Sequence, residues 1–210
     1  RDSSAPNFRY PTSSFYRLLA HMALEDCYAE NGREILHWKW NDVEVPPPST
    51  LRANARKYEV TDHRERLTRA TCELLDREGL LPDSPVALAY DITDVHWYGN
   101  PDAEWVSSDR KRNNTTQFWK YAVLSIATPG QNYVLGVQLI KNEKVVDSTL
   151  KSMLRSVLAN LTVDVEHIYM DRGLAQEDII KTCREYDLDF LIQTERRGEE
   201  IKELLKWARD

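Results

Sequence analysis

The apolar residues of this chain change their spacing near residues 80–85, and this change limits the possible folds more than any other feature. Before it, apolar side chains recur every three or four residues, as on one face of an α-helix. After it, VALAYDI (86–92), FWKYAVLSIA (118–127) and YVLGVQLI (133–140) are rich in strand-forming residues. The sequence therefore predicts a helical region over 1–82 and a mixed α/β region over 83–210.

The helical region divides at turn-forming residues. We expect helices over 13–30, closed by Asn31 and Gly32, over 49–57 and over 62–77, the last with Leu67, Ala70 and Leu74 on one face. The second and third carry the basic residues Arg52, Arg56, Lys57, Arg64, Arg66 and Arg69. Two interpretations stay open: a small helical DNA-binding domain, or a helical bracket that packs on the second region and keeps its basic residues in solvent.

The second region alternates strands and helices after an initial hairpin. The patterns predict strands over 167–171 and 189–194, and helices over 148–161, 175–186 and 199–209. A long loop separates the first strand from the hairpin that TPGQN closes. This order predicts a mixed sheet with helices on its faces.

Composition excludes several classes of protein. With 28 Lys and Arg against 34 Asp and Glu, the net charge is −6, which argues against a uniformly cationic nucleic-acid binder but allows a local basic groove. No apolar stretch approaches the roughly 18 residues of a membrane span. Cys27, Cys72 and Cys183 lack the spacing of zinc ligands, so we expect reduced thiols and a cytoplasmic protein without a membrane partner.

Two aspartates end apolar strand sequences, where a carboxylate has to be paired, hydrated or bound to a metal. Asp91 follows VALAY and Asp171 follows HIYM. Carboxylates at the carboxyl edges of neighbouring strands would converge on one place, which suits Mg²⁺ or Mn²⁺. The alternative is that both aspartates cap strand ends and bind only local amides.

Aromatic and basic residues follow Asp91. His96, Trp97 and Tyr98, together with Arg110, Lys111 and Arg112, combine stacking surfaces with positive charge, as a DNA strand requires. The alternative for the basic triplet is plain solvation. Asp94 is expected either to assist the site or to stabilise a turn. Arg172 is expected to contact a phosphate or to pair with Glu177 or Asp178.

The words YDITDVHWYG (90–99) and YMDRGL (169–174) resemble the first two acidic motifs of the DDE transposases, particularly those of archaeal and bacterial insertion sequences. The resemblance covers residues 86–194. It implies a ribonuclease-H-like mixed sheet flanked by helices, with Asp91 and Asp171 as catalytic metal ligands for two Mg²⁺ or Mn²⁺ ions in a complete site. It also implies strand cleavage at insertion-sequence ends and strand transfer to target DNA.

The chain departs from the family pattern at the third acidic residue, a Glu expected in Y-x2-R-x3-E-x6-K. Glu199 and Lys206 have the last spacing, but Glu195 stands where Arg is expected and Ile192 where Tyr is expected. We therefore expect the third acid beyond Asp210, in a chain that is C-terminally and catalytically incomplete; its identity is unknown.

The resemblance also sets expectations for partners. It implies binding to insertion-sequence ends and target DNA, with action on chromosomal DNA in the cytoplasm, and leaves open a homodimer on DNA. Two alternatives remain: a non-catalytic DNA-binding or assembly protein derived from a transposase, and a structure-selective nuclease with the same core.

Overall fold

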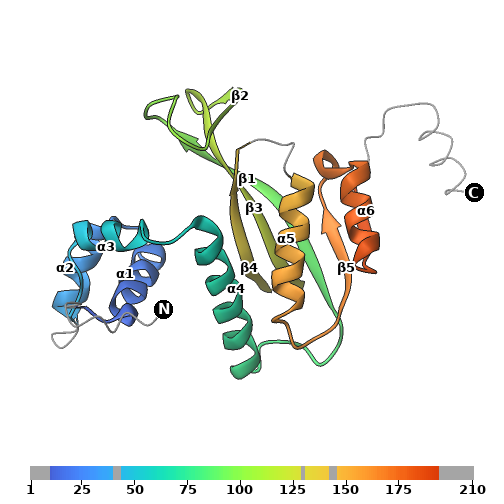
Figure 1. Cartoon of the computed structure of the whole chain (residues 1–210), viewed down its shortest axis with the longest axis horizontal. Coiled ribbons are helices and arrows are strands. Elements are labelled where there is room, and N and C mark those ends of the chain that lie inside the picture. The colour runs from blue at the N-terminus through green and yellow to red at the C-terminus, as the bar shows by residue number, and fades with distance from the viewer. Residues whose placement is uncertain (1–9, 40–43, 129–130, 142–145, 194–210) are drawn as a thin grey trace, which may run out of the picture. The chain divides into compact units, whose positions relative to one another are not determined.

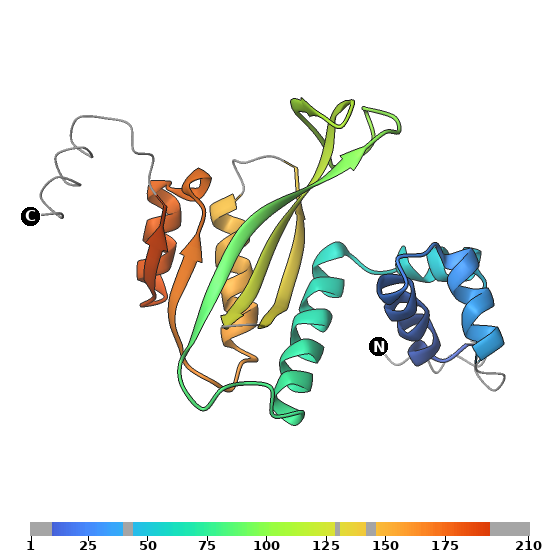
Figure 2. The same ribbon diagram turned by 180° about the vertical axis from the view of Figure 1, so that it is seen from behind.

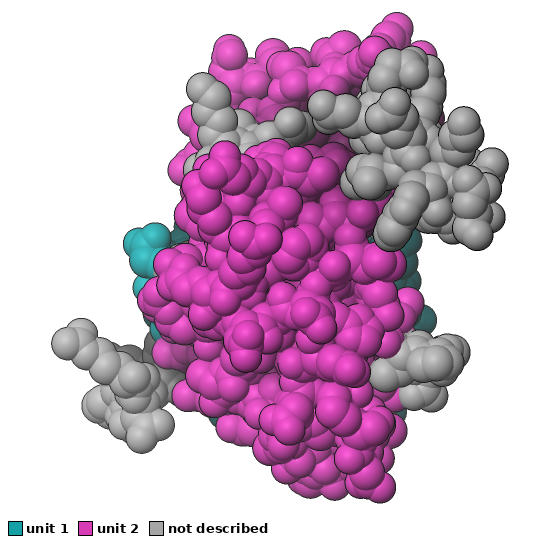
Figure 3. All heavy atoms as spheres, turned by 90° about the vertical axis from the view of Figure 1, so that its right-hand side faces the viewer, with its two compact units in different colours: residues 1–59 teal, residues 60–210 magenta. Residues whose placement is uncertain are grey.

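The computed structural model describes residues 10–39, 44–128, 131–141 and 146–193. The chain forms two compact units, Arg1–Glu59 and Val60–Asp210, which Figure 3 colours separately. This boundary lies before the predicted helix over 62–77, whereas sequence patterns place a boundary after that helix. Periodicity marks where helical spacing ends, but it does not tell on what a helix packs. In the described residues, no helix has the length and apolarity to cross a membrane.

The described part of unit 1 (10–39 and 44–59) contains three helices, α1 (Thr12–Leu24), α2 (Ala29–Lys39) and α3 (Pro48–Ala55). α3 confirms the prediction over 49–57, and it begins at Pro48 because a proline at the first helical position loses no hydrogen bond. The three helices close over a small apolar core made of Phe15, Leu18, Ala29, Leu36, Val45 and Leu51.

The prediction of one helix over 13–30 is wrong. α1 ends at Leu24, and Asp26 has a φ of 46°, a left-handed conformation that breaks the helix. Gly32 lies inside α2 rather than at a helix end. A Cβ on this glycine would lie 3.1 Å from Cγ of Met22 in α1, so the missing side chain serves close helix packing.

Unit 2 is built on a mixed sheet of six strands in the described residues. Strand β1 pairs antiparallel with β3 and parallel with β5, β3 pairs antiparallel with β4, and β5 pairs parallel with β6. The resulting order β4-β3-β1-β5-β6 is that of a ribonuclease-H-like sheet, while β2 pairs with the first residues of β3. The strands are β1 (Val86–Trp97), β2 (Val106–Arg112), β3 (Thr115–Thr128), β4 (Gln131–Ile140), β5 (Val165–Met170) and β6 (Asp189–Ile192).

Among the described residues, three helices pack on this sheet: α4 (Val60–Arg77), α5 (Val146–Leu158) and α6 (Glu177–Glu185). Figure 2 turns the sheet toward the viewer, with α5 behind it. Helix α5 confirms the prediction over 148–161, and its residues Leu150, Met153, Leu154 and Val157 are buried in the core. Cys72 and Cys183 are buried free thiols, and burial raises the pKa of both.

Helix α4 confirms the prediction over 62–77, and it packs on β4 and α5, as the bracket interpretation requires. Its packed face differs from the apolar face seen in the sequence. The buried residues are Arg64, Thr68, Cys72 and Leu75, and the Arg64 guanidinium donates a hydrogen bond to Oε1 of Gln138 in β4. A polar bond replaces an apolar contact here, so the helix turns Leu67, Ala70 and Leu74 outward.

The long loop predicted between the first two strands is wrong. β1 continues to Trp97, and β2 and β3 form a hairpin through Asn113 and Asn114, whose φ values are 47° and 66°. Positive φ at both turn residues suits a tight hairpin, and asparagine tolerates it. We call residues 94–119 the arm; Figure 1 shows it extending beyond the rest of the sheet.

Candidate active site

Asp91 lies inside β1 rather than at its end, so the expectation of a strand-end aspartate is wrong for this residue. It pairs with Val123 of β3, and the strand continues for six further residues, Ile92–Trp97, because β3 and its hairpin supply hydrogen bonds. Side chains alternate along a strand, so Asp91 points to the face opposite the buried Tyr90. The Asp91 side chain is exposed, and a charged carboxylate there keeps its hydration.

Asp171 follows the last residue of β5, as the sequence predicts. Its Oδ1 accepts a hydrogen bond of 2.7 Å from the backbone N–H of Arg172, which starts the short 3-10 helix Arg172–Leu174. The capping role proposed as the alternative is therefore present. A carboxylate has several acceptor positions, so one local hydrogen bond does not prevent a second interaction.

Strand register brings the two aspartates together. β1 and β5 are parallel neighbours in which Tyr90 pairs with Met170. Asp91 directly follows Tyr90 and Asp171 directly follows Met170, so the two aspartates lie on adjacent strands at the same level. Neighbouring strands lie about 4.8 Å apart. Both aspartates line one cavity of about 240 Å³, together with Ile92, Asp94, Lys120, Val146, Gly173, Leu174 and Gln176.

The donor set of this cavity fits one hard divalent cation such as Mg²⁺ or Mn²⁺, which prefers carboxylate oxygen and water. In the part of the chain that the structure describes, no three His, Cys, Asp or Glu side chains group as metal ligands. Glu199, the sequence candidate for a third acid, lies outside the described residues. Two carboxylates can anchor one ion, whereas holding two ions close together requires further negative ligands.

A charge network that the sequence did not reveal adjoins the cavity. Asp94 pairs across the strands with Lys120, whose Nζ lies 3.4 Å from Asp94 Oδ1 and 2.9 Å from Asp109 Oδ2. The Arg112 guanidinium contacts Asp94 and lies 3.5 Å from Asp109. Asp94 is therefore an ion-pair partner as well as a residue of the cavity lining, and a role in assisting the site stays a prediction. The pairing of position 94 with position 120 could be read only from the strand register.

The network favours the charged forms of Lys120 and Asp109. Burial acts to lower the pKa of Lys120, but the hydrogen bond to Asp109 and the charges of Asp94 and Asp109 raise it overall. The hydrogen bonds from Lys120 and from the Arg110 amide, in that order, lower the pKa of Asp109. The network thus ties β2 to β1 and β3 at the base of the arm through ion pairs.

Aromatic packing stiffens the rest of the arm. The rings of Trp97 and Trp119 stack with centroids 4.6 Å apart, and the ring centroids of His96 and Phe118 are 5.3 Å apart. The Arg112 guanidinium lies 4.5 Å from the centre of the Phe118 ring. Such contacts stabilise a two-sided ribbon that has little core of its own.

The predicted DNA-contact residues divide into two groups. Arg112 is engaged by two aspartates and an aromatic ring, whereas Arg110 and Lys111 are exposed on β2. Arg172 is exposed beside Asp171; the expected partners Glu177 and Asp178 instead contact Lys181, at 2.8 and 3.4 Å. The DNA-contact role of these residues stays a prediction.

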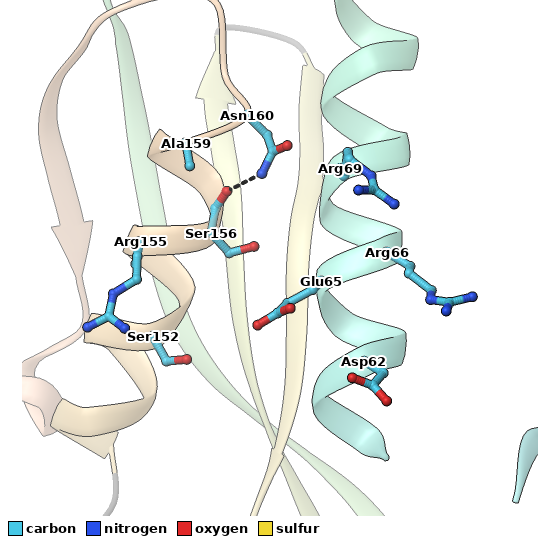
Figure 4. A pocket seen from close by; sticks show the side chains of 9 residues that line it. All are labelled: Asp62, Glu65, Arg66, Arg69, Ser152, Arg155, Ser156, Ala159 and Asn160. Carbon is cyan, nitrogen blue, oxygen red and sulfur yellow. Dashed lines mark hydrogen bonds between the residues drawn. The ribbon is translucent and has the colours of Figure 1, made fainter. Parts of the chain in front are cut away.

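A larger cavity, of about 460 Å³, lies between α4 and α5. Figure 4 shows Glu65 of α4 and Ser152 and Ser156 of α5 directed between the helices, while Arg66 and Arg155 point away from them. The guanidinium groups do not converge, so this groove lacks the character of an anion site.

Comparisons with known proteins give one family and several solved structures. A family model described as Transposase DDE domain matches residues 82–209. A simian T-cell lymphotropic virus intasome chain is 20% identical, with 62% of this chain and 38% of that chain covered and a TM-score of 0.35. The catalytic core domain of BIV integrase is 13% identical, with 58% and 63% covered and a TM-score of 0.30.

The Mos1 strand transfer complex is 14% identical, with 100% of this chain and 72% of that chain covered and a TM-score of 0.32. The chain therefore spans 38% and 63% of the first two of these relatives. Among curated proteins, no relative matches the sequence.

Replacing either aspartate of the cavity by its neutral isostere should weaken Mn²⁺ binding. We expect Asp91→Asn and Asp171→Asn each to lower the affinity by about tenfold or more, since each removes one of two charged ligands. Titration calorimetry measures the affinity, and circular dichroism checks that the fold is intact. The control is Asp187→Asn, in a turn with φ 52° that asparagine tolerates. Unchanged Mn²⁺ affinity in both site variants would contradict a shared metal.

Lys120→Met should lower the free energy of unfolding by about 1–3 kcal/mol, because the half-buried carboxylates lose a buried cation. The control Lys151→Met breaks an exposed pair with Glu185 and should cost less than about 1 kcal/mol. Urea denaturation gives both values. Equal costs for the two variants would show that the network does not stabilise the arm.

The same network predicts a pH dependence. The pKa of Lys120 is raised, so its contribution is present below the ordinary value of 10.5 and is lost as pH rises through the folded value. The pKa of Asp109 is lowered, so its contribution is present above 3.8 and is lost as pH falls through the folded value. The stability difference between wild type and Asp109→Asn should therefore shrink in acid. A difference that persists at pH 2 would be incompatible with this assignment.

Proposed function

Since the chain belongs to the family that the Transposase DDE domain defines, we propose that it catalyses metal-dependent DNA strand cleavage and strand transfer at insertion-sequence ends. The observation that carries the proposal is the register of β1 and β5, which sets Asp91 and Asp171 side by side at one cavity. The proposal places the reaction on chromosomal DNA in the cytoplasm.

Asp91 and Asp171 would hold the cation. A bound Mg²⁺ or Mn²⁺ would supply Lewis-acid activation of water and of the phosphodiester oxygens. The residues of this chain do the remaining work: the two carboxylates fix where the reacting phosphate lies, and Arg172, exposed next to Asp171, is placed to bind a phosphate oxygen. In the complete site two ions and a third carboxylate are proposed, and the third carboxylate is not assigned.

DNA would approach along the arm. Arg110 and Lys111 are exposed on β2, whose Asp109 and Arg112 pair with Lys120 and Asp94 of the cavity lining. A net charge of −6 repels DNA at long range, so phosphate binding requires such a local basic surface. The partners proposed are insertion-sequence ends and target DNA, with two copies acting as a homodimer.

The double substitution of Arg110 and Lys111 by Ala should weaken DNA binding and flatten its salt dependence. Each lost phosphate contact removes about 0.9 from the slope of log K against log salt concentration. Fluorescence anisotropy with a labelled element end measures both quantities. The matched control replaces Lys181 and Arg184 of α6 by Ala and changes the net charge equally. A slope that falls equally in both variants would indicate a general charge effect and remove the arm from the interface.

Excision of the element tests the catalytic proposal. With the full-length gene that contains this sequence, which supplies any acidic ligand beyond Asp210, and the DNA of its own element, Asp91→Asn and Asp171→Asn should each abolish excision, as detected by amplification across the donor junction. Asp187→Asn should excise like wild type. Glu199→Gln tests the sequence candidate for the third acid in the same assay. DNA binding with no excision in wild type would support the non-catalytic alternative, and excision by Asp91→Asn would refute the assigned site.

A further inference from the structure

Helix α4 presents an apolar face that the sheet does not use. Leu67 and Leu74 are 56% and 46% exposed, and Ala70 between them is also exposed. We call these three residues the outer stripe. Their spacing of three and four residues is that of a seam between two packed helices. An exposed apolar seam with this spacing is suited to a contact with another helix.

Within unit 2, the outer stripe lies on a face of α4 that does not pack on the sheet. α4 packs on β4 and α5, and its buried residues Arg64, Thr68, Cys72 and Leu75 lie on a different face of the helix from the stripe. Figure 4 shows the neighbouring Arg66 pointing away from α5. The small side chain of Ala70, at the centre of the stripe, allows two helix axes to approach closely there.

Beside the stripe, α4 carries one positive and one negative side chain that can pair with those of a second copy. Arg66 and Glu73 each precede a leucine of the stripe and lie on the same flank of the helix, one turn on either side of Ala70. In an antiparallel pair that crosses at Ala70, Arg66 of each helix lies beside Glu73 of the other, and Leu67 lies beside Leu74. A parallel pair would instead set this flank against the partner's opposite flank, so Arg66 would not meet Glu73.

From these observations we propose that two copies of the chain associate through the outer stripe, as antiparallel α4 helices related by a two-fold axis beside Ala70. The contact is isologous, because the same patch supplies both sides. Stable interfaces bury about 1,200–2,000 Å² in total, and one helix pair buries less. The association is therefore weak and concentration-dependent, and it tightens when both copies occupy one DNA. This inference does not depend on the proposed catalysis.

Disulfide trapping tests the geometry. All variants carry Cys27→Ser, since Cys27 is partly exposed while Cys72 and Cys183 are buried. A mixture of Arg66→Cys and Glu73→Cys chains, oxidised with copper phenanthroline, should give a cross-linked heterodimer and still keep one Arg–Glu pair. Either variant alone should cross-link much less. Efficient cross-linking of Arg66→Cys with itself, or none in the mixture, would overturn the antiparallel arrangement.

Sedimentation equilibrium tests the association without cysteines. Wild type should show an average mass that rises with concentration, and Leu67→Glu should weaken the self-association by about tenfold or more. The control is Leu191→Glu, at a leucine of β6 that is 65% exposed and outside the stripe. Arg66→Glu and Glu73→Arg should each weaken the dimer, and the double variant should restore it.

Two outcomes would overturn the proposal. A wild type that stays monomeric at every concentration, with Leu67→Glu lowering the melting temperature, would mean that another part of the same chain covers the stripe. A wild type that associates equally well with and without Leu67→Glu would place the interface elsewhere.

Discussion

The parallel pairing of β1 with β5 is the interaction on which the candidate site depends. Hydrogen bonds between these strands set Tyr90 opposite Met170, and this register places the next residues, Asp91 and Asp171, next to each other. Tyr90 is buried and donates a hydrogen bond of 3.1 Å from its hydroxyl to the carbonyl of Val146 at the start of α5. The same residue thus anchors the strand to the core and directs its neighbour Asp91 to the other face. A slip of one residue would turn Asp91 into the core and disrupt both.

The charge network around Lys120 connects this site to the arm. An extended hairpin with exposed strands has few apolar contacts to hold it against the sheet. Ion pairs to the buried Lys120 and the mostly buried Asp94 provide directional contacts instead. Lys120 and Asp94 lie on neighbouring strands of the main sheet, while Asp109 and Arg112 lie on β2. Because Asp94 and Lys120 of the network line the cavity, a change in the direction of the arm would move side chains of the site.

The sequence predicts those parts of the molecule in which burial and periodicity agree. Strands such as 118–127 and helix α5 have apolar residues at the spacing of their own secondary structure, and the structure confirms them. β2 was missed because VSSDRKR is polar on both faces and packs on no core, although Asn113-Asn114 is a hairpin signal. The break after α1 was missed because Asp26, rather than glycine, takes the left-handed conformation.

The candidate site shows the same division. The apolar runs together with the resemblance to the DDE motifs select Asp91 and Asp171 as candidates, but the register that makes them neighbours joins residues far apart in the chain. No local pattern encodes such pairing, so the contacts of Asp94 with Lys120 and of Arg64 with Gln138 could not be read from the sequence. The contact of Arg64 with Gln138 also decides which face of α4 is packed, because the buried guanidinium of Arg64 takes the place that a leucine would otherwise fill.

The hydrogen bond from the Arg172 amide to Asp171 has a consequence for ligand binding. A side chain that is already restrained to one rotamer loses little conformational entropy when a ligand engages it. The backbone of the short helix after β5 therefore orients this carboxylate before any cation arrives, whereas Asp91, exposed on an extended strand, has to be ordered by the ligand. A cation would thus meet one prearranged and one adaptable oxygen donor, and the adaptable one can follow changes in coordination while the other keeps the ion in place.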